Sequence, residues 1–221
     1  MIALPKFRGL AKHRTAAERE LFARTIAGAG FDPIAVGAII EMESAHTWDP
    51  SVAGAKGAFG ADKYAVGLIQ FAPGTAKALG TSTAELERMT FAEQLPFVVK
   101  YYQMWGGPSA FARPGDYYLA GWGAPPNTPD DFVLSRQGAK AYEWNAVLDT
   151  NGDGTITARE LRSLVNGQIA YARTFGEWLI DERVPVPAVV HEGSWLPYFA
   201  LAVGLGSVAL VARKRRRQRT P

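Results

Sequence analysis

The segment from Asp32 to Pro50 constrains the fold more than any other part of the chain, because a long apolar run in it ends beside two glutamates. Asp32 is a candidate N-cap, and Pro33 suits the first position of a helix. The pattern therefore predicts a helix from Pro33 to about Ser44, with the chain breaking at Asp49-Pro50. We expect the rest of the domain to be arranged around this helix.

The two glutamates near the end of this helix should face different ways. At about 100° per residue, Glu43 shares a side with Ile39 and Ile40, whereas Glu41 points away from them. Glu43 thus ends an apolar stripe, where desolvation would raise the pKa of its carboxyl group and keep it protonated near neutral pH. Such a group can donate a proton to a leaving oxygen. Periodicity alone also allows a solvated Glu43 at a fraying helix end, with Ser44 as the cap.

A second motif follows a glycine-rich connection over residues 51–66, which we expect to be a loop or short hairpin that walls one side of a cleft. It reads Gly67-Leu68-Ile69-Gln70-Phe71, then Ala72-Pro73-Gly74-Thr75-Ala76. Together with the Glu43-Ser44 pair that closes the helix, this order of motifs closely resembles the lytic transglycosylase and goose-type lysozyme superfamily. The resemblance implies a mainly α-helical, lysozyme-like fold. It also implies that Glu43 is the single catalytic acid/base and that Ser44 and Gln70 contribute to substrate binding in the groove.

A third family block, usually Leu-Ala-x-Tyr-Asn-Ala-Gly, is matched imperfectly by residues 116–125. Trp122 stands at the tyrosine position and Gly123 at the asparagine position, so the hydrogen bond of the family tyrosine cannot be carried over. Tyr118 lies one helical turn before Trp122 and could face the same way. Both are candidate substrate-binding residues, with simple packing as the alternative for Tyr118.

The resemblance implies that peptidoglycan is the substrate. Glu43 would protonate the glycosidic oxygen between N-acetylmuramic acid and N-acetylglucosamine, then act as base on the sugar's own 6-hydroxyl to give a 1,6-anhydro product. A conventional glycosidase needs two carboxylates, for which Asp49 and Asp62 are the candidates, so a hydrolytic lysozyme is the second hypothesis. The altered third block supports another alternative, a calcium-stabilised wall-binding protein that has lost catalysis.

A twelve-residue segment, Asp149 to Glu160, fits the EF-hand calcium loop, with oxygen ligands, a turn glycine and an apolar residue at the expected places. An unoccupied Asp-Gly turn is the simpler alternative. Similar loops occur in phage-type members of the resembled group, which implies a structural Ca²⁺ that holds the following helix against the domain. The expected side-chain ligands are Asp149, Asn151, Asp153 and Glu160, with Thr155 binding through its carbonyl and Thr157 through water.

Several further elements follow from local patterns. Residues 1–13 are basic and only briefly apolar, and we interpret them as a surface arm. A helix is expected from about Thr15 to Ala27, and capping-box patterns start two more at Ser82 and Thr90, the second running to about residue 105. Its tyrosines, 101 and 102, are interpreted as groove-wall or core aromatics without a chemical role.

The C-terminal part of the chain predicts a membrane anchor. Residues 195–212 carry no charge and are followed by six of the 24 Lys and Arg residues, leaving 18 basic against 21 acidic residues in the remainder, so a nucleic-acid-binding body is not expected. As a helix, the apolar run would reach about 27 Å and could span a bilayer, although a buried core helix is an alternative. The cations predict a cytoplasmic C-terminus and a catalytic domain on the wall side.

The expected organisation is therefore a lysozyme-like domain over residues 1–182, a linker over 183–194, a single transmembrane helix over 195–212 and a basic tail over 213–221. Its partners would be peptidoglycan glycan strands and, through the helix, a lipid bilayer. A phage lysis or virion-entry protein and a bacterial membrane protein both suit this organisation. The absence of cysteine excludes disulfides and thiol chemistry.

Overall fold

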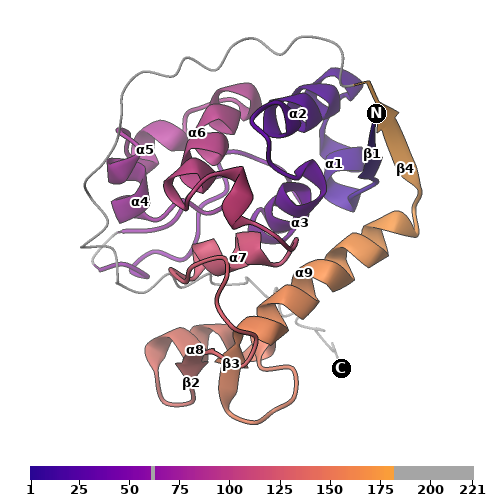
Figure 1. Ribbon diagram of the computed structural model, residues 1–221. Coiled ribbons are helices and arrows are strands. Elements are labelled where there is room, and N and C mark those ends of the chain that lie inside the picture. The colour runs from indigo at the N-terminus through magenta and orange to yellow at the C-terminus, as the bar shows by residue number, and fades with distance from the viewer. Residues whose placement is uncertain (61–62, 182–221) are drawn as a thin grey trace, which may run out of the picture.

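The computed structural model describes residues 1–60 and 63–181 and is mainly α-helical, with two small antiparallel sheets (Figure 1). The described helices are α1 (Arg8–His13), α2 (Ala16–Gly28), α3 (Pro33–Glu43), α4 (Pro73–Ala78), α5 (Thr83–Leu86), α6 (Phe91–Met104), α7 (Asp116–Gly121), α8 (Lys140–Asn145) and α9 (Ala158–Arg173). Short 3₁₀ turns occur at η1 (Pro108–Ala110) and η2 (Ala146–Leu148). The strands are β1 (Ile2–Pro5), β2 (Val133–Arg136), β3 (Thr155–Thr157) and β4 (Glu177–Ile180). The expectation of a mainly α fold is confirmed.

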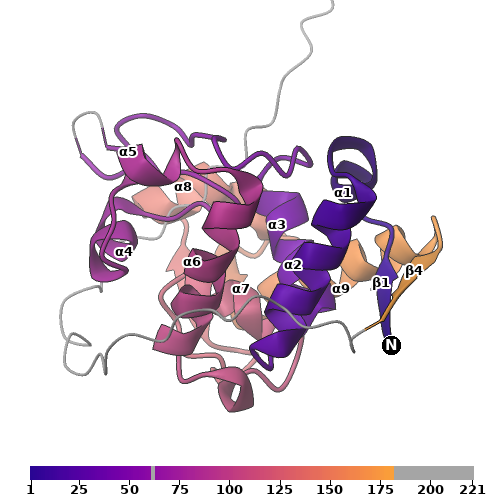
Figure 2. The same ribbon diagram turned by 90° about the horizontal axis from the view of Figure 1, so that it is seen from above.

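Helix α3 lies at the centre of the domain and packs against α1, α2, α7, α9 and β1 (Figures 1 and 2). It begins as predicted, because the Asp32 carboxylate accepts a hydrogen bond from the Ile34 N–H at 2.8 Å and Pro33 follows the cap. Nine of its eleven residues are buried, which requires neighbours on almost every side. At Gly37 the ring of Phe7, the residue just before α1, leaves no room for a side chain, since a Cβ there would lie 2.7 Å from it.

The N-terminal residues supply part of that cover, and the prediction of a surface arm over residues 1–13 was wrong. Strand β1 pairs with β4 near the other end of the described chain, with Ile2 opposite Ile180. Leu4, Phe7 and Leu10 are completely buried. Their spacing changes from that of a strand to that of a helix within ten residues, so neither period is long enough to stand out in the sequence.

The capping patterns place the next helices correctly. Thr15 and Thr90 each form a full capping box, with Glu18 and Glu93 respectively, at the starts of α2 and α6. The Ser82 hydroxyl accepts the N–H of Glu85 at the start of α5. These local bonds satisfy helix N–H groups that have no partner within the helix.

Helix α9 connects the two ends of the molecule: Figure 1 shows β2, β3 and α8 at its start and β4 after its end. It is held to α7 by Arg162, which donates from Nε to Asp116 at 2.7 Å and from Nη2 to the Thr128 carbonyl at 2.7 Å. Both Arg162 and Asp116 are buried. The contact requires glycine at 115, where a Cβ would lie 2.4 Å from the Arg162 Cα. The position of α7, which carries Tyr118, therefore depends on α9.

No helix within residues 1–60 and 63–181 is long and apolar enough to cross a bilayer. The predicted linker over 183–194, transmembrane helix over 195–212 and basic tail over 213–221 lie outside the described residues.

Candidate active site

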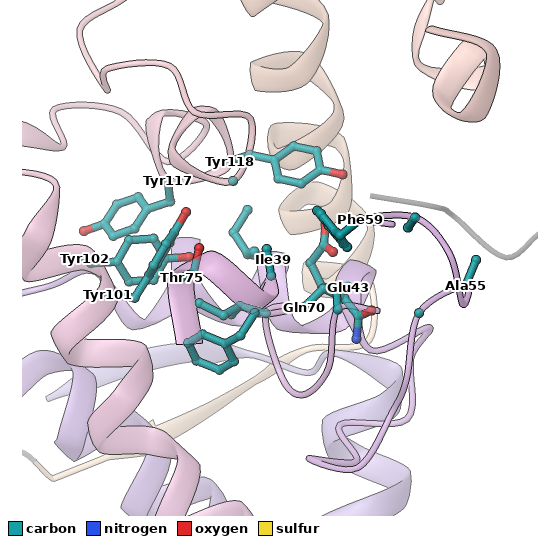
Figure 3. Close-up of a pocket in the computed structure, with 17 residues that line it drawn as sticks. Ile39, Glu43, Ala55, Phe59, Gln70, Thr75, Tyr101, Tyr102, Tyr117 and Tyr118 are labelled. Atoms are coloured by element: carbon teal, nitrogen blue, oxygen red, sulfur yellow. The ribbon is translucent and has the colours of Figure 1, made fainter. Parts of the chain in front are cut away.

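A pocket with about 680 Å³ of empty space, part of it open to solvent, lies where α3, α6 and α7 meet the loop before α4. Figure 3 shows its lining residues, with Glu43 between Tyr118 and Gln70 in that view. Three of the predicted site residues thus line one cavity, although they come from α3, α7 and a loop. The glycine-rich connection forms the opposite wall through residues such as Gly54, Ala55 and Phe59.

The Glu43 side chain lies at the end of α3 and is almost fully buried, with the residue only 6% exposed. Within the described part of the chain, neither of its carboxyl oxygens has a hydrogen-bond partner. Burial raises the pKa of Glu43 to about 8, against a smaller lowering effect of Tyr118. The solvated alternative is therefore wrong, and Glu43 is a carboxylic acid that holds its proton at neutral pH.

Tyr118 is the polar side chain that affects the pKa of Glu43. Its hydroxyl is buried and influences the Glu43 carboxyl, but it makes no hydrogen bond within the described residues. Burial and then the charge of Glu43 hold the pKa of Tyr118 well above its usual range, so the hydroxyl stays neutral. Trp122, the other candidate, is the C-cap residue of α7; it is half-buried, interacts with Tyr118 and does not line the pocket.

Gln70 lines the pocket in a fixed orientation. Its backbone is left-handed, with φ +53°, and its Nε2 donates to the carbonyls of Val52 at 3.0 Å and Gly67 at 3.1 Å. The side-chain oxygen of Gln70 lies so close to Gly54 that a Cβ on residue 54 would be 2.9 Å from this oxygen. The amide is therefore tied to the loop, and the pocket wall is built around it.

The buried Gln94 of α6 holds this loop and was missed in the sequence. Its Oε1 accepts the N–H of Leu68 at 3.0 Å, while its Nε2 donates to the carbonyls of Pro50 and Leu86 at 2.7 Å. It also occupies the space beside Gly67, where a Cβ would be 2.5 Å from Oε1. A glutamine among the apolar positions of α6 was the available signal.

Ser44 does not line the pocket, and the structure corrects its predicted role in substrate binding. The residue is fully buried, and its hydroxyl donates to the Ile40 carbonyl at 2.6 Å. The same oxygen accepts the N–H of Trp48 at 2.9 Å. Ser44 therefore fixes the turn that ends α3 and so positions Glu43. The Ser44 hydroxyl itself is buried and out of reach of a substrate.

Glu41 faces away from the pocket, as predicted, but it is fully buried in a cluster that the sequence analysis did not anticipate. Its carboxylate accepts hydrogen bonds from the Gly9 N–H at 3.0 Å, the Trp48 indole N–H and His46 Nδ1 at 3.1 Å. Burial alone would raise the pKa of Glu41, but the hydrogen bonds from these three residues outweigh it and the pKa is lowered. Glu41 thus stays ionised while Glu43, two residues away, stays protonated.

Aromatic side chains form the other wall of the pocket. Tyr101, Tyr102 and Tyr117 line it and belong to one cluster of ring contacts, with Tyr102 and Tyr117 centroids 5.0 Å apart. Tyr101 and Tyr102 were expected as groove-wall or core aromatics, and they are both. Tyr117 was not singled out, because one tyrosine beside another in a short helix gives no distinct signal.

The pocket contains one carboxyl group among the described residues, that of Glu43. Asp49, a candidate second carboxylate, does not line the pocket, and its Oδ1 accepts both the N–H and the hydroxyl of Ser51 at 2.8 Å. Asp62, the other candidate, lies outside the described residues. The described pocket therefore offers acid/base chemistry at a single carboxyl.

The chain matches no protein-family model, no curated protein and no solved structure. The motifs and the geometry of this pocket are therefore the features that bear on its function.

The predicted calcium loop lies between α8 and α9. The Asp149 carboxylate accepts the N–H groups of Gly152 and Gly154 at 2.8 Å, and the Tyr142 hydroxyl donates to it at 2.6 Å. Both glycines have positive φ, and Thr155–Thr157 forms β3 against β2. In the described chain no three His, Cys, Asp or Glu side chains converge on one point.

The loop's donor set nevertheless fits a hard cation in chemistry, because it consists of carboxylate, amide and carbonyl oxygens. Asn151, Asp153 and Thr155 follow one another along the exposed side of the loop, linked through side-chain hydrogen bonds. Glu160 is turned to the start of α9, where its oxygens accept the N–H groups of Thr150 and Thr157 at 2.8 and 2.9 Å. Calcium therefore stays a prediction for this loop.

If the loop binds Ca²⁺, chelation should lower the melting temperature, because a ligand bound only by the folded state adds roughly 4 kcal/mol at a thousandfold excess over Kd. Asp149→Ala should remove the response to EDTA, whereas Asp131→Ala, at an exposed acid outside the loop, should keep it. Differential scanning calorimetry with and without EDTA measures both. A wild-type melting curve indifferent to EDTA would rule out the calcium assignment.

Proposed function

We propose that the protein is a lytic transglycosylase that cuts peptidoglycan between N-acetylmuramic acid and N-acetylglucosamine. The observation that carries the proposal is Glu43, a buried and unpartnered carboxylic acid in a pocket with no second described carboxyl group. Its place before Ser44, and the presence of Gln70 in the same pocket, agree with the motifs that resemble the superfamily.

The reaction needs one group that first gives and then takes a proton. Protonated Glu43 donates to the glycosidic oxygen as the bond to C1 of the muramic sugar breaks. The resulting carboxylate removes the proton of the 6-hydroxyl, whose oxygen bonds to C1 and closes the 1,6-anhydro ring. Glu43 ends protonated, and no water is consumed. The neutral hydroxyl of Tyr118 can support the carboxylate at the middle of the cycle.

Hydrolysis is the second candidate, because Asp62 lies outside the described residues. A hydrolase with two carboxylates would leave a reducing end on the muramic sugar, one water heavier than the anhydro end. Mass spectrometry of muropeptides released from purified walls separates the two products, and we expect anhydro ends. Reducing ends would favour a lysozyme. No release at all would favour the wall-binding protein without catalysis.

The pH profile of kcat/KM should show a falling limb near pH 8, because only protonated Glu43 can start the reaction and burial raises its pKa to about 8. Activity should therefore persist through neutral pH, where an ordinary carboxyl with pKa 4.5 would be almost fully ionised. Turbidity loss of wall suspensions from pH 5 to pH 10 provides the measurement, with wall binding followed separately. A limb near pH 4.5 would show that Glu43 is not held protonated.

We also propose that the enzyme is anchored in a membrane and stabilised by calcium. Residues 195–212 would anchor it as a single transmembrane helix with a cytoplasmic C-terminus, and the catalytic domain would lie on the wall side, with structural Ca²⁺ at the loop over 149–160. Sequence alone supports this anchor and its orientation.

A further inference from the structure

Exposed apolar side chains gather at one end of the domain. In the described parts of the chain six large apolar residues are exposed, and three of them, Tyr171, Phe175 and Leu179, follow one another through the end of α9 and into β4. Leu179 is 71% exposed, and the rings of Tyr171 and Phe175 meet edge to face at 5.1 Å. Apolar side chains that gather in this way mark surfaces that bind something.

The pairing of β1 with β4 shows that Leu179 faces outward. Leu4 lies opposite Trp178 and Ile2 opposite Ile180, and this face of the sheet turns to the core, with Leu4 and Ile180 buried. Side chains alternate between the two faces of a strand, so Leu179 stands on the other face. On this face Leu179 is exposed, whereas Ala3 opposite it is half-buried and Pro5 is buried.

Cations surround these apolar residues. Arg8 donates from Nη1 to the Tyr171 hydroxyl at 3.5 Å, and Arg173 at the end of α9 pairs with Glu177 at 3.3 Å. Lys6 lies at the edge of this surface: its ammonium is 6.0 Å from the centre of the Trp178 ring, on the core side of the sheet, and 3.6 Å from where a Cβ on Gly176 would be. These three cations outnumber the carboxylates of Glu177 and Asp181 at this end.

The chain leaves the domain at this same end. After β4, residues 182–194 separate it from the uncharged run over 195–212, a distance of roughly 45 Å even if fully extended. Figures 1 and 2 both place β1 and β4 at the end of the domain opposite α4 and α5. The pocket lies between α3, which supplies Ile39 and Glu43, and the α4 side, which supplies Ala72 and Thr75, so one of its walls stands at the end opposite the strands.

We propose that the face formed by Tyr171, Phe175, Leu179, Arg8 and Arg173, with Lys6 at its edge, docks on a bilayer that contains anionic phospholipid. The apolar side chains would enter the boundary between headgroups and acyl chains, and the cations would pair with lipid phosphates. Docking holds the pocket away from the membrane and toward the wall. The proposal uses the predicted anchor to bring the face to lipid, but it is independent of the chemistry of Glu43.

The chain contains no cysteine, so single cysteines can report on this face in the full-length protein. Leu179→Cys carries a polarity-sensitive dye at the docking face, and Val147→Cys, at a residue 67% exposed beside the calcium loop, is the matched control. The proteins are reconstituted with phosphatidylcholine vesicles, with or without phosphatidylglycerol. We expect the label at 179 to be several-fold less accessible to an aqueous quencher than the label at 147, and only with phosphatidylglycerol present.

Removing the cations tests the electrostatic part. Each lost cation should weaken anionic-membrane docking about fivefold, so Lys6→Gln with Arg8→Gln should restore most of the quenching at 179. High salt should act in the same direction. Floating the vesicles in high salt separately shows whether the predicted anchor inserts, and wall lysis by the same variants reports on Glu43.

Four outcomes would overturn the docking face. These are equal quenching at 179 and 147 in vesicle-bound protein, protection that needs no anionic lipid, protection without any vesicles, and failure of the full chain to float with anionic vesicles at low salt. Protection without vesicles that grows with protein concentration would identify a second copy of the chain as the occupant. Protection independent of concentration would identify the chain's own residues 182–221.

Discussion

Glu43→Gln is expected to lower wall lysis about a thousandfold or more, since general acid catalysis contributes roughly 10²–10⁴-fold and no other described carboxyl lines the pocket. The substitution keeps the shape of the side chain and removes only the transferable proton. Turbidity loss and muropeptide release measure the effect, with binding to walls as the control for folding. Full lysis by the variant would refute the assignment of Glu43.

The stability of this variant tests the same carboxyl in another way. Because burial raises the pKa of Glu43 from 4.5 to about 8, the folded state loses stability relative to the unfolded state as the pH rises between these values. Glutamine does not ionise. The melting temperatures of wild type and variant should therefore agree near pH 4.5, and the variant should melt higher at pH 8.

Glu41→Gln is expected to show the opposite behaviour, with the domain destabilised by about 2–3 kcal/mol and the pocket chemistry kept. The glutamine has one acceptor oxygen for the N–H groups of Gly9 and Trp48, and its own amide hydrogens would face these donors. The His46 ring also loses its charged partner. At neutral pH the melting temperature should fall by roughly 5–10 °C for a domain of this size.

The comparison of the two variants assigns the two glutamates. Lysis per folded molecule, measured well below the melting temperature, should survive Glu41→Gln and not Glu43→Gln. Hydrogen bonding lowers the pKa of Glu41, so the stability that it contributes is present above pH 4.5 and is lost as the pH falls below that value. The stability gap to wild type should shrink accordingly in acid. Equal loss of lysis from both substitutions would contradict the separate roles.

Local signals predicted the parts of the fold that depend on local bonds. The Asp32 cap, the capping boxes at Thr15 and Thr90, and the start of α3 could be predicted because each depends on residues within one turn of the helix start. The burial of Glu43 could be predicted too, since it continues the apolar stripe of its own helix.

The remaining features depend on partners far away in sequence. Glu41 is buried because the Gly9 backbone and the Trp48 indole reach it, and no pattern around residue 41 reports on residue 9. The predicted role of Ser44 in substrate binding was wrong for a related reason. Its hydroxyl donates a hydrogen bond to the Ile40 carbonyl and accepts one from the Trp48 N–H once the turn closes. Of the candidate catalytic and substrate-binding residues, Glu43, Gln70 and Tyr118 meet in the pocket, whereas Ser44 and Trp122 do not line it.

The pairing of Ile2 with Ile180 has a consequence for the order of folding. Strand β1 is made before every other described element, but its partner β4 is the last strand of the described chain to be made. The N-terminal residues must therefore wait, with Leu4 unpaired, until nearly the whole domain has been synthesised. Contacts between such distant residues make folding slow. A nascent chain that ends before β4 can complete neither the sheet nor the cover that it gives to α3.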